Sequence, residues 1–223
     1  MKRHNTIDTE NPKAHYRSRS LPHWSNGLSP VFITYRLKFT LPAAKAIELN
    51  EMKTEWYKEL QSLKSEAKEA KLKTKDGLFF AWFDELISKS DEVPHFLQEK
   101  EITDIIADSF RYFDRVRYEL IAYCIMPNHV HVLILPLEQE NGKAYPLSHI
   151  TYTWKKFTAA AINRRLAKGG NLWQAESYDH LVRDELELDR VINYILQNPV
   201  KAGLVKKWQD WYGTWLNVAH PVK

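Results

Sequence analysis

Two histidines lie two residues apart at the start of an apolar run, in the segment PNHVHVLILP at 127–136. In a β-strand, alternate side chains point to the same face, so His129 and His131 could present two imidazole nitrogens to one divalent ion. Two ligands from one strand do not complete a metal site, which needs at least a third ligand from elsewhere in the fold. Taken alone, the pair is better explained as one hydrogen-bonded core histidine and one histidine at a strand end.

A tyrosine and an asparagine lie four residues apart in the helix-periodic stretch DELELDRVINYILQNP, at 184–199. Tyr194 and Asn198 therefore share one helical face. Asn198 precedes Pro199, a position at which helices usually end, and its side chain carries an amide oxygen. Taken alone, Tyr194 is explained as an amphipathic core aromatic and Asn198 as a helix-terminal cap.

The positive charge of the chain is unevenly distributed. The net charge is only +4, but the stretch from 141 to 175 contains no acidic residue. Its six cations are Lys143, Lys155, Lys156, Arg164, Arg165 and Lys168. A surface of one sign predicts contact with phosphates, and a solvated basic helix face is the alternative. Arg17 and Arg19, in a polar N-terminal arm at 1–20, could contact DNA in the same way.

Composition narrows the class of protein. The chain has 223 residues, of which 44% are hydrophobic and 27% charged, as in a folded protein. Its one cysteine, Cys124, excludes an intramolecular disulfide and a cysteine-based zinc site. Neither a secretory signal nor a run of about 18 apolar residues is present, so we expect a cytoplasmic protein.

The spacing of apolar residues, together with proline and glycine, predicts the helices and strands that must position these residues. We expect strands at 31–42, 117–126 and 129–137, the last two joined by a turn at Pro127-Asn128. We expect helices at 99–114, 148–170 and 184–199, and an inserted helical hairpin at 43–90. The helix at 148–170 should be capped by Ser148, closed by Gly169-Gly170, and buried through Ile150, Trp154, Phe157 and Ala161.

This order lacks a regular βαβ alternation and predicts an α+β fold with an antiparallel sheet. We expect a basic arm at 1–20, a single domain at 21–206 and a Trp-rich tail at 207–223. Asp184 is the expected cap of the last helix.

At this point the residues carry a family resemblance. PNHVHVLI resembles the HUH motif (His, hydrophobic, His) of single-tyrosine endonucleases. The chain from about 16 to 206 is similar to REP-associated tyrosine transposases, relatives of the IS200/IS605 transposases. The similar segments, in order, are LPHW, FITYRL, LIAYCIMPNHVHVLILPL, TWKKFTAAAIN, LWQAESYDHLVRDE and YILQNPVKAGLV.

The resemblance implies a ferredoxin-like core with a central antiparallel sheet. It also implies that His129, His131 and Asn198 hold a divalent metal ion, Mg²⁺ or Mn²⁺, and that Tyr194 is the nucleophile. The expected substrate is single-stranded DNA with palindromes that fold into hairpins. A monomer is favoured over a dimer.

The residue chemistry fits this implication. Two imidazoles and an amide oxygen leave positions open on an ion that could polarise a scissile phosphate. A phenol has a reference pKa of about 10 and needs rigid placement to attack. Attack would give a 5′-phosphotyrosine and a free 3′-OH. The alternatives are a hairpin-binding regulatory protein without cleavage, and a phosphohydrolase that uses water and dispenses with Tyr194.

Overall fold

The computed structural model describes residues 29–38, 51, 58 and 94–220 of the chain. The predicted arm at 1–20, with Arg17 and Arg19, lies outside these residues. So does the predicted hairpin at 43–90, apart from Glu51 and Lys58, which are exposed and helical.

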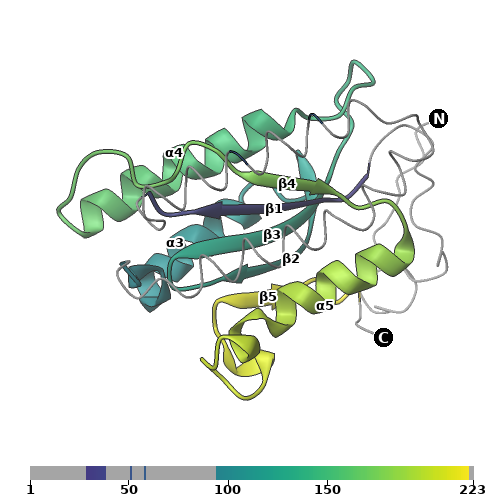
Figure 1. Ribbon diagram of the computed structural model, residues 1–223. Coiled ribbons are helices and arrows are strands. Elements are labelled where there is room, and N and C mark those ends of the chain that lie inside the picture. The colour runs from purple at the N-terminus through teal and green to yellow at the C-terminus, as the bar shows by residue number, and fades with distance from the viewer. Residues whose placement is uncertain (1–28, 39–50, 52–57, 59–93, 221–223) are drawn as a thin grey trace, which may run out of the picture.

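In the described part of the chain, five antiparallel strands form one sheet in the order β4-β1-β3-β2-β5 (Figure 1). The strands are β1 (Val31–Arg36), β2 (Tyr118–Ile125), β3 (His129–Pro136), β4 (Tyr178–Leu181) and β5 (Thr214–Leu216). Helix α3 (Lys100–Arg111) lies between β1 and β2 in the chain, and α4 (Leu147–Arg165) lies between β3 and β4. This βαββαβ order with β4 beside β1 is a ferredoxin-like arrangement, so the predicted α+β class is confirmed.

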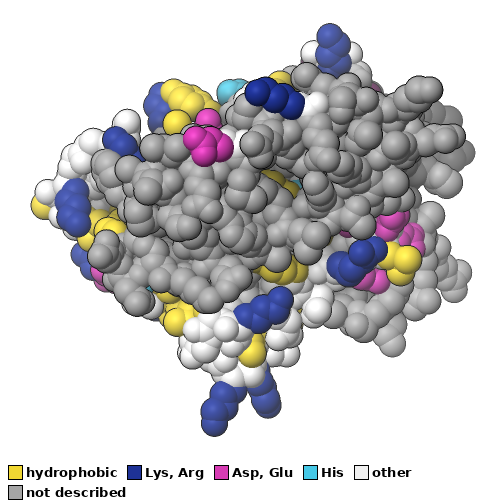
Figure 2. All heavy atoms as spheres, viewed as in Figure 1, with side chains coloured by type: hydrophobic (Ala, Val, Ile, Leu, Met, Phe, Trp, Pro, Cys, Tyr) yellow, Lys and Arg dark blue, Asp and Glu magenta, His cyan; other side chains and the backbone are white. Residues whose placement is uncertain are grey.

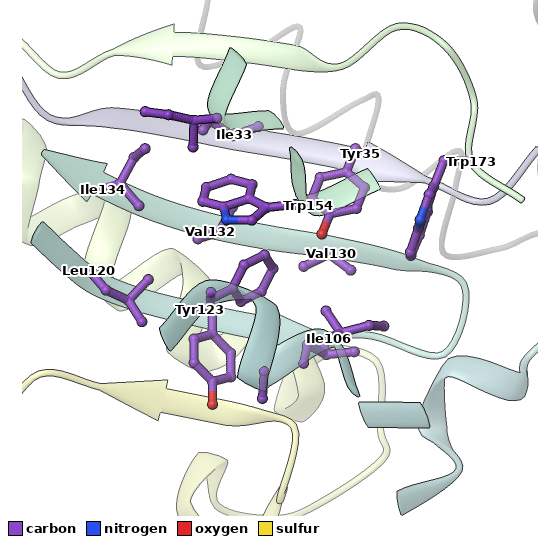
Figure 3. Close-up of a cluster of buried hydrophobic side chains, with 14 of the residues drawn as sticks. Ile33, Tyr35, Ile106, Leu120, Tyr123, Val130, Val132, Ile134, Trp154 and Trp173 are labelled. Atoms are coloured by element: carbon purple, nitrogen blue, oxygen red, sulfur yellow. The ribbon is translucent and has the colours of Figure 1, made fainter. Parts of the chain in front are cut away.

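Helices α3 and α4 cover one face of the sheet and enclose the larger core (Figures 1 and 3). Trp154 of α4 lies over Val132 near the centre of this core. Its indole Nε1 donates a 2.8 Å hydrogen bond to the Tyr118 hydroxyl, which donates in turn to the Phe110 carbonyl at 2.7 Å. The polar atoms of these buried aromatics are therefore paired, and they fix how α4 packs on the sheet.

Helix α5 (Glu185–Lys201) covers the opposite face (Figure 1). Its predicted cap is confirmed, because the Asp184 side chain accepts a 2.8 Å hydrogen bond from the Glu187 amide. Leu188, Ile192 and Ile195 are buried in the second core, as the helical periodicity predicted.

Helix α5 does not end at Pro199, as the predicted range 184–199 had it, but continues to Lys201. Proline has no N–H, so the Ile195 carbonyl, four residues earlier, loses its usual helical donor. The helical pattern resumes at once, since the Ala202 amide donates to the Asn198 carbonyl at 3.0 Å. The turn that carries Asn198 is therefore still helical.

Strands β2 and β3 form a hairpin whose turn is Pro127-Asn128, as predicted; the Met126 amide donates to the His129 carbonyl at 2.9 Å. Successive side chains of β3 point to opposite faces of the sheet. Val130, Val132 and Ile134 belong to the core under α3 and α4. The histidines between them project to the α5 face.

Helix α4 differs from the prediction at both ends and on one face. It begins at Leu147 after Pro146, so Ser148 lies within it, and it ends at Arg165, before the two glycines. Phe157, expected in the core, is 54% exposed. The buried positions follow an i, i+4 line through Ile150, Trp154, Thr158 and Ile162. Threonine fits there because its hydroxyl donates to the Trp154 carbonyl at 2.7 Å.

Two short edge strands were not expected. Strand β4 lies in a stretch predicted as loop and pairs with β1, and β5 of the Trp-rich tail pairs with β2. Strand β1 ends at Arg36, before the predicted end at 42, and two 3₁₀ helices, Phe96–Gln98 and Trp208–Asp210, are the remaining elements of the described residues. Within the described residues, no helix has the length and apolar character needed to cross a membrane.

Candidate active site

The predicted histidine pair is buried on the α5 face of the sheet. His129 and His131 are 1% and 0% exposed, and their Nε2 atoms lie 3.0 Å apart. Their rings meet nearly edge to face, at an interplanar angle of 76°. The two imidazoles therefore converge through the same ring nitrogen, as the HxH spacing on one strand required.

Each imidazole has a hydrogen-bond partner at Nδ1, the ring nitrogen that does not face the other histidine. The Asn128 Oδ1 lies 2.6 Å from His129 Nδ1, and the Thr34 hydroxyl of β1 lies 2.8 Å from His131 Nδ1. An amide oxygen only accepts, so His129 Nδ1 carries the proton and its Nε2 holds a lone pair. A hydroxyl both donates and accepts, so Thr34 is compatible with either tautomer of His131.

The ring proton of neutral His131 can therefore lie on either Nε2 or Nδ1. With no ion between the rings, His131 Nε2–H donates to His129 Nε2, and the Thr34 hydroxyl donates to His131 Nδ1. Moving the His131 proton to Nδ1, where Thr34 then accepts it, exposes a lone pair on both Nε2 atoms. Neutral imidazoles with a hydrogen-bonded Nδ1–H are the usual form of metal-ligating histidine.

Tyr194 of α5 lies against this pair. Its ring centroid is 5.7 Å from that of His131 and 6.1 Å from that of Phe32, in edge-on contacts. Phe32 in turn stacks on His131 at 5.7 Å. The Lys201 ammonium lies 4.9 Å from the Tyr194 ring centroid. The phenol thus lies beside the imidazoles, in contact with the His131 and Phe32 rings, and has a cation over its own ring.

Asn198 lies one helical turn after Tyr194 and is 2% exposed. Its side-chain nitrogen has no hydrogen-bond partner among the described residues. A buried donor without a partner costs about 1–3 kcal/mol, and a ligand with an acceptor, such as a phosphate oxygen, could pair with it, whereas a metal ion would bind the amide oxygen instead. In the described chain no cluster of three or more His, Cys, Asp or Glu side chains could hold a metal ion. A metal site on this face would therefore depend on the amide.

Of the predicted DNA-contacting cations of α4, two bond to other parts of the protein and two do not. Lys155 donates to the carbonyls of Gln174, Ala175 and Glu176 at 3.1, 3.1 and 3.3 Å. Burial lowers the pKa of its ammonium to about 8. Arg165 forms an ion pair with Glu101 of α3. Lys155 therefore connects α4 to the segment before β4, and Arg165 connects α4 to α3.

Lys156 and Arg164 are exposed, and neither forms an ion pair with another described residue. Lys155 and Lys156 line an open groove of about 1170 Å³ between α4 and the segment 170–179. Because α4 covers the opposite face of the sheet, this groove is separated from the histidine pair by the sheet. On the face seen in Figure 2, the described Lys and Arg side chains are scattered and form no single basic patch.

A family comparison bears directly on this site. Residues 95–198 match the family model described as "Transposase IS200 like", and this match contains His129, His131, Tyr194 and Asn198. Over residues 95–198 the chain is therefore similar to the IS200-like transposase family. The resemblance inferred from the motifs is thereby confirmed.

Individual relatives of the IS200-like region carry related names. A Haemophilus influenzae protein, provisionally named a REP-associated tyrosine transposase, is 30% identical over 99 residues. That match covers 42% of this chain and 56% of the relative. The REP-associated tyrosine transposase of Escherichia coli K12 is 29% identical over 94 residues, which cover 42% of this chain and 52% of the relative. The chain thus spans little more than half the length of these relatives.

A solved structure also resembles the chain. It is described as a REP-associated tyrosine transposase bound to a REP hairpin. The similarity covers 83% of this chain and 75% of that one, at 18% identity and a TM-score of 0.48.

Two functional residues were missed from sequence. Thr34 and Asn128 hold the imidazoles but were considered only as parts of a strand and a turn. Asn128 could have been found, because it directly precedes the HxH pair. Thr34 could not, because its contact to His131 spans 97 residues and depends on how β1 pairs with β3.

Proposed function

We propose that the chain is a metal-dependent endonuclease and strand transferase that acts on single-stranded, hairpin-forming DNA through a 5′-phosphotyrosine. One observation carries this proposal: the His129–His131 pair, with Nε2 atoms 3.0 Å apart, packs against Tyr194, one turn before the buried amide of Asn198. The similarity of residues 95–198 to the IS200-like transposases supports it.

Two neutral imidazoles that converge through their Nε2 atoms could hold one divalent ion. We propose Mg²⁺, which prefers oxygen ligands, or Mn²⁺, which accepts imidazole more readily, as that ion. His129 and His131 would hold it, with Asn198 as the third ligand. When bound, the ion would act as a Lewis acid on a phosphate oxygen.

The chain's own residues would then carry out the transfer. The Tyr194 hydroxyl oxygen attacks the phosphorus, so that an O–P bond to tyrosine forms and the bond from phosphorus to the 3′ oxygen breaks. The phenolic proton passes to solvent, and the 3′ oxygen leaves as a hydroxyl after taking up a proton. Because one phosphodiester replaces another, a 3′-OH can reverse the step and rejoin strands.

The substrate class follows from the relatives. Two of them are named for REP elements, so we propose hairpins of REP-like palindromes as the DNA that this chain binds. Lys156 and Arg164, exposed cations of α4 that form no ion pair with a described residue, are candidates to contact its backbone, with Lys155, Arg165, Arg17 and Arg19 as further candidates. Because the substrate is DNA, the proposal includes a cytoplasmic location. We propose a monomer as the active form.

An oligonucleotide gel tests the proposal. Purified protein is incubated with labelled DNA hairpins that carry single-stranded flanks, in Mn²⁺, and resolved under denaturing conditions. We expect a slow-migrating covalent adduct that disappears in Tyr194→Phe, in His131→Ala and after chelation. Tyr178→Phe is a matched control, because Tyr178 is a partly buried β4 tyrosine packed on the same core, and it should keep the adduct.

The same gel separates the alternatives. A hairpin-binding protein would shift the DNA in a native gel without an adduct, and chelation would change nothing. A water-using phosphohydrolase would cleave the DNA without an adduct, and Tyr194→Phe would retain cleavage. An adduct that survives Tyr194→Phe would refute the assignment of the nucleophile.

A further inference from the structure

The cations of α4 lie across the sheet from Tyr194. Helices α3 and α4 cover one face, whereas α5 and the histidine pair lie on the other (Figure 1). Lys156 and Arg164 could contact one part of a DNA hairpin, but a strand that meets Tyr194 must cross the α5 face. Residues that guide this strand to Tyr194 must therefore lie around α5.

The charge along α5 changes sign before Tyr194. The first turns of the helix carry the acids Glu185, Glu187 and Asp189, but the chain from 190 to 209 contains no acidic residue. The cations of this stretch are Arg190, Lys201, Lys206 and Lys207. Charges of both signs are normally mixed on a protein surface, so a long stretch of one sign indicates contact with a polyanion.

Lys201 lies beside the proposed nucleophile. It follows Tyr194 by two helical turns on the same face of α5, and its ammonium is 4.9 Å from the centroid of the Tyr194 ring. Lys201 is exposed and forms no ion pair with a described residue. As the last residue of α5 it also complements the helix dipole, which is the structural explanation of its charge.

A defined turn directs the chain that leaves α5. Gly203 has a φ of 71°, in the left-handed region, and its amide donates to the Val200 carbonyl at 3.0 Å. The Leu204 amide donates to the Pro199 carbonyl at 2.9 Å. These two bonds form a Schellman motif, which ends the helix and fixes the direction of the next segment.

Two more lysines lie in that segment. Val205 and Trp208 pack against the same core as Tyr194, and Lys206 and Lys207 between them are exposed. In the view of Figures 1 and 2, Lys and Arg side chains protrude where α5 ends. The helix dipole does not explain these two lysines, because its effect falls off within the last turn and both lie beyond it.

We propose that a single-stranded flank of the DNA crosses the end of α5 on its way to Tyr194, and that Lys201, Lys206 and Lys207 bind its phosphates. This inference rests on the proposed DNA substrate and states where its single strand lies. Each ammonium binds a phosphate as a point charge. Phosphate contacts position a strand without reading its bases, so these lysines serve any flank sequence.

The test measures binding with chelator present and needs no cleavage. Fluorescent DNA hairpins carry single-stranded flanks, each with one uncharged methylphosphonate at a different position. Affinity and its salt dependence are measured for wild type, Lys201→Gln and the double variant Lys206→Gln/Lys207→Gln. The matched control is Arg115→Gln, which removes an exposed cation from the loop before β2, at the end of the β2–β3 pair away from His129.

We expect binding to weaken about fivefold for each lysine removed, as for the stronger exposed ion pairs. The slope of log K against log salt should become shallower by about 0.7 per lysine. One methylphosphonate should weaken wild type and leave Lys201→Gln unchanged, and other positions should do the same for the double variant. Flanks of different sequence should give the same losses, and Arg115→Gln should respond to every methylphosphonate as wild type does.

A structural role predicts another pattern. If Lys201 only complements the helix dipole, Lys201→Gln lowers the melting temperature and leaves the DNA affinity unchanged, which would overturn the inference. On the phosphate-binding model, Lys201→Arg keeps the affinity because it keeps the charge. Losses that are equal at all methylphosphonate positions and match those of Arg115→Gln would reflect net charge alone, and they would also overturn it.

The outcome is separable from that of the proposed function. Coupling between these lysines and particular phosphates, with no covalent adduct in Mn²⁺, would refute the endonuclease and leave the path of the strand standing. An adduct that requires Tyr194, with no coupling at the lysines, would refute the path alone. Failure of the wild type to bind any of the hairpins would overturn both.

Discussion

Replacing Thr34 by valine tests how the histidine pair is kept ready for an ion. The Thr34 hydroxyl lies 2.8 Å from His131 Nδ1, and both residues are almost fully buried. Valine keeps the shape and removes the hydroxyl. To bind a metal through Nε2, His131 must then carry its proton on Nδ1, where no hydroxyl accepts it.

The magnitude follows from the cost of that unpaired donor. A buried N–H without an acceptor costs about 1–3 kcal/mol, which weakens metal binding by roughly 5- to 150-fold. Loss of a hydrogen-bonding partner behind a ligating histidine typically weakens metal affinity about 10–100-fold, in the same range. Without metal, the loss of one net hydrogen bond of about 1 kcal/mol should lower the melting temperature by roughly 2–4 °C.

Isothermal titration with Mn²⁺ measures the effect, with two controls. Thr34→Ser keeps the hydroxyl and should bind Mn²⁺ nearly as wild type does. Thr158→Val removes an equally buried hydroxyl that accepts from Trp173 Nε1 at 2.8 Å under α4. It should lower stability and leave Mn²⁺ affinity intact. Affinities of Thr34→Val and Thr158→Val that agree within roughly twofold would refute the reasoning.

Two further predictions concern Asn198 and Lys155. Asn198→Ala should abolish the Mn²⁺-dependent adduct yet leave the free energy of urea unfolding unchanged or higher, because its buried nitrogen lacks a partner among the described residues; a large loss of stability would contradict this. For Lys155, the folded state releases the proton near pH 8 and the unfolded chain near 10.5. Stability of wild type should therefore rise from pH 8 to 10 relative to Lys155→Arg, which stays charged; parallel pH profiles in urea unfolding would contradict the burial of Lys155.

The features of the fold that depend on residues close in sequence could be predicted from the sequence. The β2–β3 hairpin and the Asp184 cap depend on residues close in sequence, and both are confirmed. The same holds for the HxH spacing, because a strand's alternation alone sets the shared face of both imidazoles.

What escaped prediction depends on pairing over long distances. Strand β4 is four residues long with alternating partial exposure, so its sequence does not differ from a loop until β1 supplies a partner. Thr34 reaches His131 only through the register of β1 on β3. Phe157 was assigned to the core because it falls at helical spacing from Ile150 and Trp154, but the structure buries Thr158, whose hydroxyl bonds its own helix, and exposes the phenyl ring.

Proline inside α5 removes one backbone hydrogen bond from the helix. Tyr194 lies before the Ile195 carbonyl that loses its donor, in the part of α5 that begins at the Asp184 cap and packs in the second core. Asn198 lies in the turn that lacks this bond. Opening of this turn breaks one bond fewer than opening of a regular helical turn, and it would displace the amide before the phenol. The proposed nucleophile and the proposed third ligand, four residues apart on one face, are therefore joined by a turn that lacks a backbone hydrogen bond.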